Sequence, residues 1–132
     1  MDVRDNEILF IFNSKLYDDN KARGYITSLH KHKIKEHDLF NESLTERQIA
    51  EIAQRMNIPV EGLLDRQSAT YREKFSGTEL KGHDLLKVLK ENPDVMKTPL
   101  VIMEHKAVVI DDPYTFVKDD MDMGGVQRGY KS

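Results

Sequence analysis

The sequence has no cysteine among its 132 residues. Without a thiol the chain can form no disulfide, offer no thiolate to a metal and attack no substrate through sulfur. It also has no apolar run of about 18 residues and no basic segment that leads into an apolar one at its start, so we expect neither a membrane span nor a secretory leader. These absences predict a cytoplasmic protein that is not attached to a membrane and has no thiol chemistry of its own.

Neither sign of charge dominates the chain. Lysine and arginine number 20 against 23 aspartates and glutamates, which gives a net charge of -3 at pH 7. Proteins that bind the phosphate backbone carry basic patches, so direct binding of nucleic acid is not expected. A domain of this length can bury about two-thirds of its unfolded surface without a metal or a disulfide.

Predicted strands and helices alternate along the chain. Short β-rich apolar runs indicate strands, and apolar residues three or four positions apart indicate helices. The expected strands cover residues 7–12, about 30–39, 99–103 and 107–110, and the expected helices cover about 18–30, 43–56, 63–64, 71–75, 80–91 and 113–118. The helix near residue 43 has an S-x-x-E capping box, Ser43-Leu44-Thr45-Glu46, whose serine and glutamate can each satisfy a free N–H.

The order of these elements is β-α-β, a helical insertion over about 43–95, and then β-β-α. This order is that of the thioredoxin-like fold, an α/β fold with a mixed four-stranded sheet, here with an inserted helical layer. We expect one domain over residues 1–118. The tail over 119–132 is predicted to be flexible, because its aspartates and glycines leave little apolar surface to pack.

Six segments carry a resemblance to a known family. They are the strand that ends at Asn13, NKA at Asn20 to Ala22, and the stretches LTERQIAEIAQRM, GLLDRQSATYREKF, LLKVLKENPDVMKTPLVI and KAVVIDDP. Their order and spacing, over residues 7 to 118, resemble those of the glutaredoxin-like arsenate reductases and their regulatory relatives, the bacterial-type ArsC and Spx proteins. The resemblance implies the same thioredoxin-like fold.

The resemblance also shows where a nucleophile would lie. Reductases of this family have the pattern N-x-x-C-x-x-S-R-K-A, in which the dipole of the first helix lowers the pKa of the cysteine. In this chain Leu16 occupies the position of the nucleophile, Asp19 that of the second cysteine of the regulatory relatives, and Asn20 that of the arginine. The resemblance therefore implies the fold without the family's nucleophile.

The oxyanion site of the family is missing as well. The positions that resemble the oxyanion-binding arginines of a reductase hold Asp65, Thr98, and Asp111 or Asp112. Neither a carboxylate nor a threonine can supply the bidentate guanidinium contact that an oxyanion needs. Similarity can suggest the label of arsenate reductase, but we expect no reduction of arsenate by the family's usual mechanism.

A metal site is not predicted either. His30 and His32 alternate in a segment expected to be extended, but they share a face only if both lie in the strand. His37, His83 and His105 offer no partner at helical spacing. A solvated basic surface explains these side chains better than a metal pair does.

A binding role inherited from the family would use the edge beside the former nucleophile. The residues expected at this edge are Asn13, Ser14, Lys15, Leu16, Tyr17, Thr98 and Pro99. Thr98-Pro99 resembles the cis-proline dipeptide that borders the active site in this fold, and we expect a cis bond. Leu16 can either form an exposed apolar contact with Tyr17 or turn inward and fill the vacated site.

Three functions remain open at the level of the sequence. The leading one is a redox-inactive regulatory or interaction module that binds a protein partner and needs no cofactor. The second is a glutathione-binding or glutathione-dependent protein, with Tyr17 or Ser14 as the orienting hydroxyl and Thr98 as a source of backbone hydrogen bonds. The third is a scaffold domain within an assembly.

Overall fold

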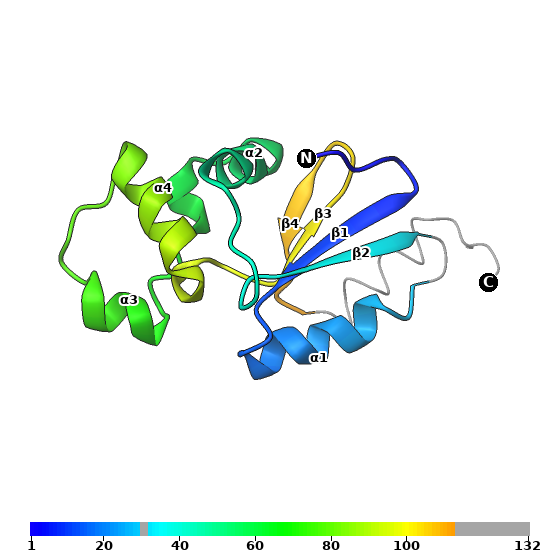
Figure 1. Ribbon diagram of the computed structural model, residues 1–132, viewed down its shortest axis with the longest axis horizontal. Helices are drawn as coiled ribbons and strands as arrows, with labels where there is room; N and C mark the ends of the chain where they lie inside the picture. The colour runs from blue at the N-terminus through cyan, green and yellow to red at the C-terminus, as the bar shows by residue number, and fades with distance from the viewer. Residues whose placement is uncertain (30–31, 113–132) are drawn as a thin grey trace.

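The computed structural model of the protein describes residues 1–29 and 32–112 and is built around one four-stranded sheet. The strand order is β2-β1-β3-β4, with β1 parallel to β2 and antiparallel to β3, and β3 antiparallel to β4 (Figure 1). The strands are β1 (Glu7–Phe12), β2 (Lys33–Asp38), β3 (Leu100–Ile102) and β4 (Ala107–Val109). The predicted mixed sheet is confirmed.

Helices cover the sheet unequally. Among the described helices, Figure 1 shows α1 along one side of the sheet, α2 on the opposite side, and α3 and α4 beyond the end of the sheet. The α-helices are α1 (Tyr17–Ile26), α2 (Glu46–Met56), α3 (Ala69–Lys74) and α4 (Gly82–Glu91), and the 3-10 helices are η1 (Val60–Leu63) and η2 (Pro93–Val95). The predicted insertion of helices between the two β-containing halves is therefore confirmed.

β1 is buried on both faces, which explains its nearly continuous apolar sequence. Ile8, Phe10 and Phe12 pack with Ile26 of α1 in one buried cluster. Ile11 belongs to a second cluster, which β1 shares with α2, α4, β3 and β4. The strand thus runs through the centre of the molecule and delivers the loop that follows it to the start of α1.

The start of α2 differs from the prediction. The capping box is not Ser43 with Glu46 but Thr45 with Gln48: the Thr45 hydroxyl accepts from the Gln48 N–H, and the Gln48 side chain accepts from the Thr45 N–H, both at 3.0 Å. Leu44 and Ile49, which flank this box, are both buried in the same cluster. They occupy the two positions of a hydrophobic staple, and their burial fixes the start of the helix two residues later than the S-x-x-E motif suggests.

α1 ends at Ile26, before the predicted end near residue 30. The two residues that follow turn their hydroxyls back onto the last turn, where Thr27 Oγ1 donates to the Gly24 carbonyl at 3.3 Å and Ser28 Oγ donates to the Tyr25 carbonyl at 2.5 Å. Such bonds compete with continuation of the helix. The helix predicted over 113–118 and the tail over 119–132 lie outside the described residues.

Candidate binding site

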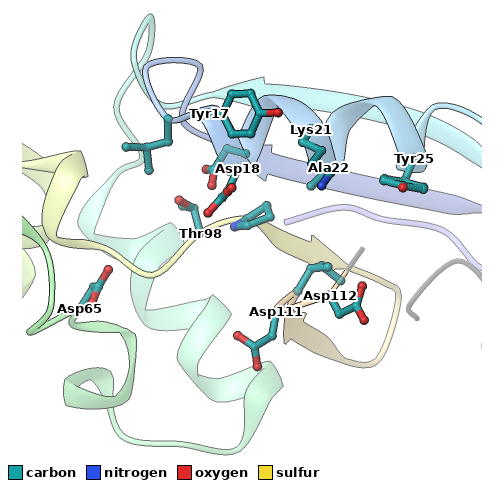
Figure 2. A pocket seen from close by; sticks show the side chains of 13 residues that line it. Tyr17, Asp18, Lys21, Ala22, Tyr25, Asp65, Thr98, Asp111 and Asp112 are labelled. Atoms are coloured by element: carbon teal, nitrogen blue, oxygen red, sulfur yellow. The ribbon is translucent and has the colours of Figure 1, made fainter. Parts of the chain in front are cut away.

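A pocket of about 920 Å³ lies where β1 ends and α1 begins (Figure 2). The start of α1 forms one wall, and the segments around Asp65, before β3 and after β4 complete it. The residues that line it are Leu16, Tyr17, Asp18, Asp19, Lys21, Ala22, Tyr25, Asp65, Thr98, Pro99, Ile110, Asp111 and Asp112. The Thr98-Pro99 bond is cis, as predicted.

Asn13 organises the loop between β1 and α1 from inside. Its side chain is 1% exposed, its Oδ1 accepts from the Lys15 N–H at 3.0 Å, and its Nδ2 donates to Asp94 Oδ1 at 2.9 Å. Its backbone N–H donates to Asp19 Oδ2 at 2.8 Å. A buried amide with all these partners holds the loop in shape and is not presented to a ligand.

Asp38, at the end of β2, ties a second loop to the first. Its Oδ1 accepts from the backbone N–H groups of Ser14 and Phe40, each at 3.0 Å, and its Oδ2 accepts from Asn41 Nδ2 at 3.0 Å. Phe40 is 57% exposed, and Lys15 Nζ lies 5.6 Å from the centre of its ring. Phe40 is thus an exposed aromatic side chain that does not line the pocket.

Leu16 is the N-cap of α1 and stays on the surface. It has the extended backbone of an N-cap, with φ -99° and ψ 128°, but forms no side-chain cap, and its exposed fraction is 41%. Leucine is among the poorest residues for this position, because it can accept no hydrogen bond from the first turn. The inward-turned alternative is therefore wrong: Leu16 lies at the rim of the pocket beside Tyr17, which is 78% exposed.

Asp19 behaves unlike an ordinary first-turn carboxylate. It is 2% exposed, and its burial raises the pKa, as does the neighbouring Asp18 carboxylate, while the Thr98 hydroxyl and the Asn13 N–H act in the opposite direction. The buried Thr98 Oγ1 lies near enough to Asp19 to lower its pKa, yet it makes no hydrogen bond of regular geometry within the described ranges. The Thr98 hydroxyl is thus engaged with Asp19, and its oxygen is not exposed to the pocket.

The lining of the pocket is acidic. Of the described residues that line it, five are aspartates, namely Asp18, Asp19, Asp65, Asp111 and Asp112, and Lys21 is the single lysine or arginine. An anion entering this space meets more negative than positive charge at close range. The arrangement is the reverse of an oxyanion site.

The structure brings together part of the predicted binding edge. Leu16, Tyr17, Thr98 and Pro99 line the pocket, whereas Asn13, Ser14 and Lys15 do not. The pattern analysis missed Lys21 and Tyr25. Their spacing of four from Tyr17 and from each other was the available signal, since residues four apart share one face of a helix.

Neither a metal site nor a membrane span is evident in the described part of the chain. No group of three or more histidine, aspartate or glutamate side chains converges there as metal ligands would. His30, one of the two alternating histidines, falls outside the described ranges. None of the helices described has the length and apolar character that crossing a bilayer requires.

The sheet order, the helical insertion and the cis-proline at the pocket define an α/β domain of the thioredoxin-like class. Solved structures of similar fold include the arsenate reductase from Vibrio cholerae, which has a TM-score of 0.72 and 13% identity, with coverage of 89% of this chain and 98% of that one. An ArsC family related protein from Bacteroides fragilis has a TM-score of 0.67 and 17% identity, with coverage of 87% and 98%.

A third such structure is an arsenate reductase (ArsC) related protein from Brucella melitensis, with a TM-score of 0.64, 19% identity, and coverage of 83% of this chain and 91% of that one. No protein-family model and no curated protein sequence matches the chain. These likenesses confirm the predicted fold: the chain has the thioredoxin-like fold of the ArsC arsenate reductases, and it has no cysteine.

Proposed function

We propose that this chain is a redox-inactive, ArsC-like binding protein, a regulatory or interaction module whose partner is another protein. The observation that carries the proposal is the exposure of Leu16, 41%, beside Tyr17, 78% exposed, at the rim of the pocket. Adjacent exposed apolar side chains beside a concave surface are typical of contacts between proteins. The cytoplasmic location expected from the sequence remains a prediction.

Reduction of arsenate through a protein thiol is not available to this chain, because it contains no cysteine. The oxyanion would also face Asp65 and Asp111, which line the pocket where the family resemblance places arginines. Carboxylates raise the energy of a bound oxyanion instead of lowering it. The surface is therefore better suited to binding than to this reaction.

Glutathione is the second candidate. The hydroxyl-bearing Tyr17 and Thr98 line the pocket, and this placement favours glutathione. Its two carboxylates, however, would enter a space walled by five aspartates and one lysine. Because like charges repel more strongly where water is partly excluded, a protein partner is the better supported ligand.

The test is capture of a partner from a native lysate with immobilised protein, followed by the same experiment with Leu16→Ala and Tyr17→Ala. Each variant should lose capture of the same partner by about tenfold or more, as truncation of a central contact does. Phe40→Ala is the matched control, because Phe40 is also exposed but does not line the pocket. Capture that survives both pocket variants and fails with the Phe40 variant would move the contact surface away from the pocket.

Glutathione is tested separately by titration into ¹⁵N-labelled protein. We expect the amides of Leu16, Tyr17 and Thr98 to keep their chemical shifts at millimolar glutathione. Saturable shifts at these amides would favour the second candidate over the first.

A further inference from the structure

We infer, on the basis of the proposed function, that the pocket receives an arginine side chain from a segment of the partner protein. An apolar neighbour of this arginine then packs on Leu16 and Tyr17 at the rim. The charge of the pocket, its walls and its rim each support this chemistry.

The charge of the pocket favours a cationic group. Asp18 lies on α1, Asp65 on the segment after η1, and Asp111 beyond β4, so that the aspartates lining the space come from three separate segments of the chain (Figure 2). Lys21 offsets one of these charges. A partner segment with a positive side chain is therefore complementary to the pocket, whereas an acidic segment is repelled.

The arrangement favours an extended organic cation over a metal ion. A metal ion needs several oxygen ligands at little more than 2 Å from one point, and the described residues hold no convergent group of three or more acidic or histidine side chains. An arginine instead has a long stem and a planar head with five N–H donors, which can contact carboxylates that lie apart.

The walls of the pocket suit both parts of an arginine side chain. Ala22, Pro99 and Ile110 line it with apolar atoms, against which the methylene stem can pack. Tyr17 adds an aromatic face, on which a guanidinium stacks more favourably than an ammonium does.

The rim indicates a protein segment instead of a small free cation. Leu16 and Tyr17 stand 41% and 78% exposed at the opening, and a small amine inside the pocket would leave both uncovered. A polypeptide that inserts an arginine places its neighbouring side chains over this rim. Apolar contact there and charge pairing inside then act together, as in a typical interface with an arginine anchor.

The test is selection of random peptides displayed on phage against the immobilised, folded protein. We expect the enriched peptides to share an arginine next to an apolar residue. Replacing that arginine by the neutral isostere citrulline in a synthetic copy should weaken binding by about tenfold to a hundredfold, because charge-assisted hydrogen bonds are lost. Enriched peptides without basic residues, or binding that is indifferent to citrulline, would overturn the inference.

A charge-matched pair of variants locates the arginine. Asp65→Asn with Asp111→Asn removes two carboxylates from the pocket and preserves their shape, including the Asp65 Oδ1 that accepts from the Gln67 N–H at 2.9 Å. Asp2→Asn with Asp5→Asn is the control, since both residues are exposed and precede β1, at the opposite end of the strand from the pocket. The pocket pair should weaken the selected peptides by about tenfold or more, and the control pair by less than about twofold.

The peptides also separate failure of this inference from failure of the proposed function. Peptides that lack arginine but lose binding with Leu16→Ala would leave the proposed surface in place and refute the arginine. Selection that enriches no peptide dependent on Leu16, Tyr17, Asp65 or Asp111 would refute both.

Discussion

The two helices α1 and α2 begin in opposite ways. At α2, Thr45 and Gln48 satisfy each other's N–H groups, and the buried Leu44 and Ile49 secure the first turn. At α1 the N-cap is Leu16, which forms no side-chain cap and is 41% exposed. The local capping rule is obeyed at α2 and broken at α1, which borders the pocket, and departures of this kind are expected at functional sites. A missing cap alone does not mark such a site, because α4 also begins at a residue, Lys81, that forms no side-chain cap.

The loop that leads into α1 is nevertheless held in place by several hydrogen bonds. The Asn13 N–H donates to Asp19, the Asp38 carboxylate accepts from the Ser14 N–H, and Asn20 Nδ2 donates to the Ser14 carbonyl at 2.7 Å. These bonds hold the loop that leads into α1, but none of them accepts from the free N–H groups of its first turn. The Leu16 side chain therefore caps nothing and stands partly exposed at the rim of the pocket.

The largest effect in this comparison is expected at the cap of α2. Thr45→Ala should lower the free energy of unfolding by about 0.5–2 kcal/mol, since the first turn loses its acceptor. Leu16→Ala should change stability by much less, because the side chain caps nothing and is partly in water. Urea denaturation of both variants measures the difference, and an equal loss of stability would show that Leu16 supports α1 through packing.

The sequence could predict the elements whose signals are local. The apolar run at the start of the chain predicts the strand β1, which spans Glu7–Phe12 as expected. The apolar spacing near residue 80 predicts α4, which begins at Gly82, within two residues of the predicted start. The start of α2 was misplaced because two capping motifs overlap in Ser43 to Gln48 and burial of Leu44 decides between them. A choice that depends on tertiary contacts cannot be made from spacing alone.

The site was predictable only in part for the same reason. The family resemblance places Leu16, Thr98 and Asp65 near one another, and the pocket contains all three. It does not reveal that Asp19 folds back onto the Asn13 N–H and becomes buried. That contact depends on the conformation of the loop between β1 and α1, which the spacing of apolar residues in the sequence does not predict.

Two aspartates at the site should respond to pH in opposite directions. Burial raises the pKa of Asp19 above its ordinary value of 3.8. Burial also acts to raise the pKa of Asp38, but hydrogen bonds from Ser14 and Phe40 outweigh it and hold this pKa below 3.8. The raised pKa of Asp19 contributes stability that is fully present below pH 3.8 and is lost as the pH rises through the pKa of the folded state. The lowered pKa of Asp38 contributes stability that is present above pH 3.8 and is lost as the pH falls through the pKa of the folded state.

Asparagine variants separate the two carboxyl groups. Asp19→Asn keeps an acceptor for the Asn13 N–H and removes the buried charge. At pH 7 this variant should therefore melt at or above the melting temperature of the wild type. The difference should vanish at lower pH, where Asp19 of the wild type becomes protonated. Asp38→Asn should melt below the wild type at pH 7, and its deficit should shrink under acid conditions. Melting temperatures measured between pH 3 and pH 8 test both trends, and parallel curves for the two variants would contradict the opposite environments.

The smallest expected change in stability, that of Leu16→Ser, tests the difference between the starts of α1 and α2 most directly. Leu16→Ser gives α1 the side-chain acceptor that α2 already has, in an extended backbone with φ -99° and ψ 128° that suits an N-cap. We expect a gain of about 0.3–1 kcal/mol in the free energy of unfolding, together with loss of the captured partner. Tyr17→Ala is the control, because it should lose the partner without gaining stability. Denaturant titration and partner capture on the same samples measure both quantities. A Leu16→Ser variant that is less stable than the wild type would show that leucine supports the fold at this position, and one that still binds the partner would show that leucine is not needed for contact.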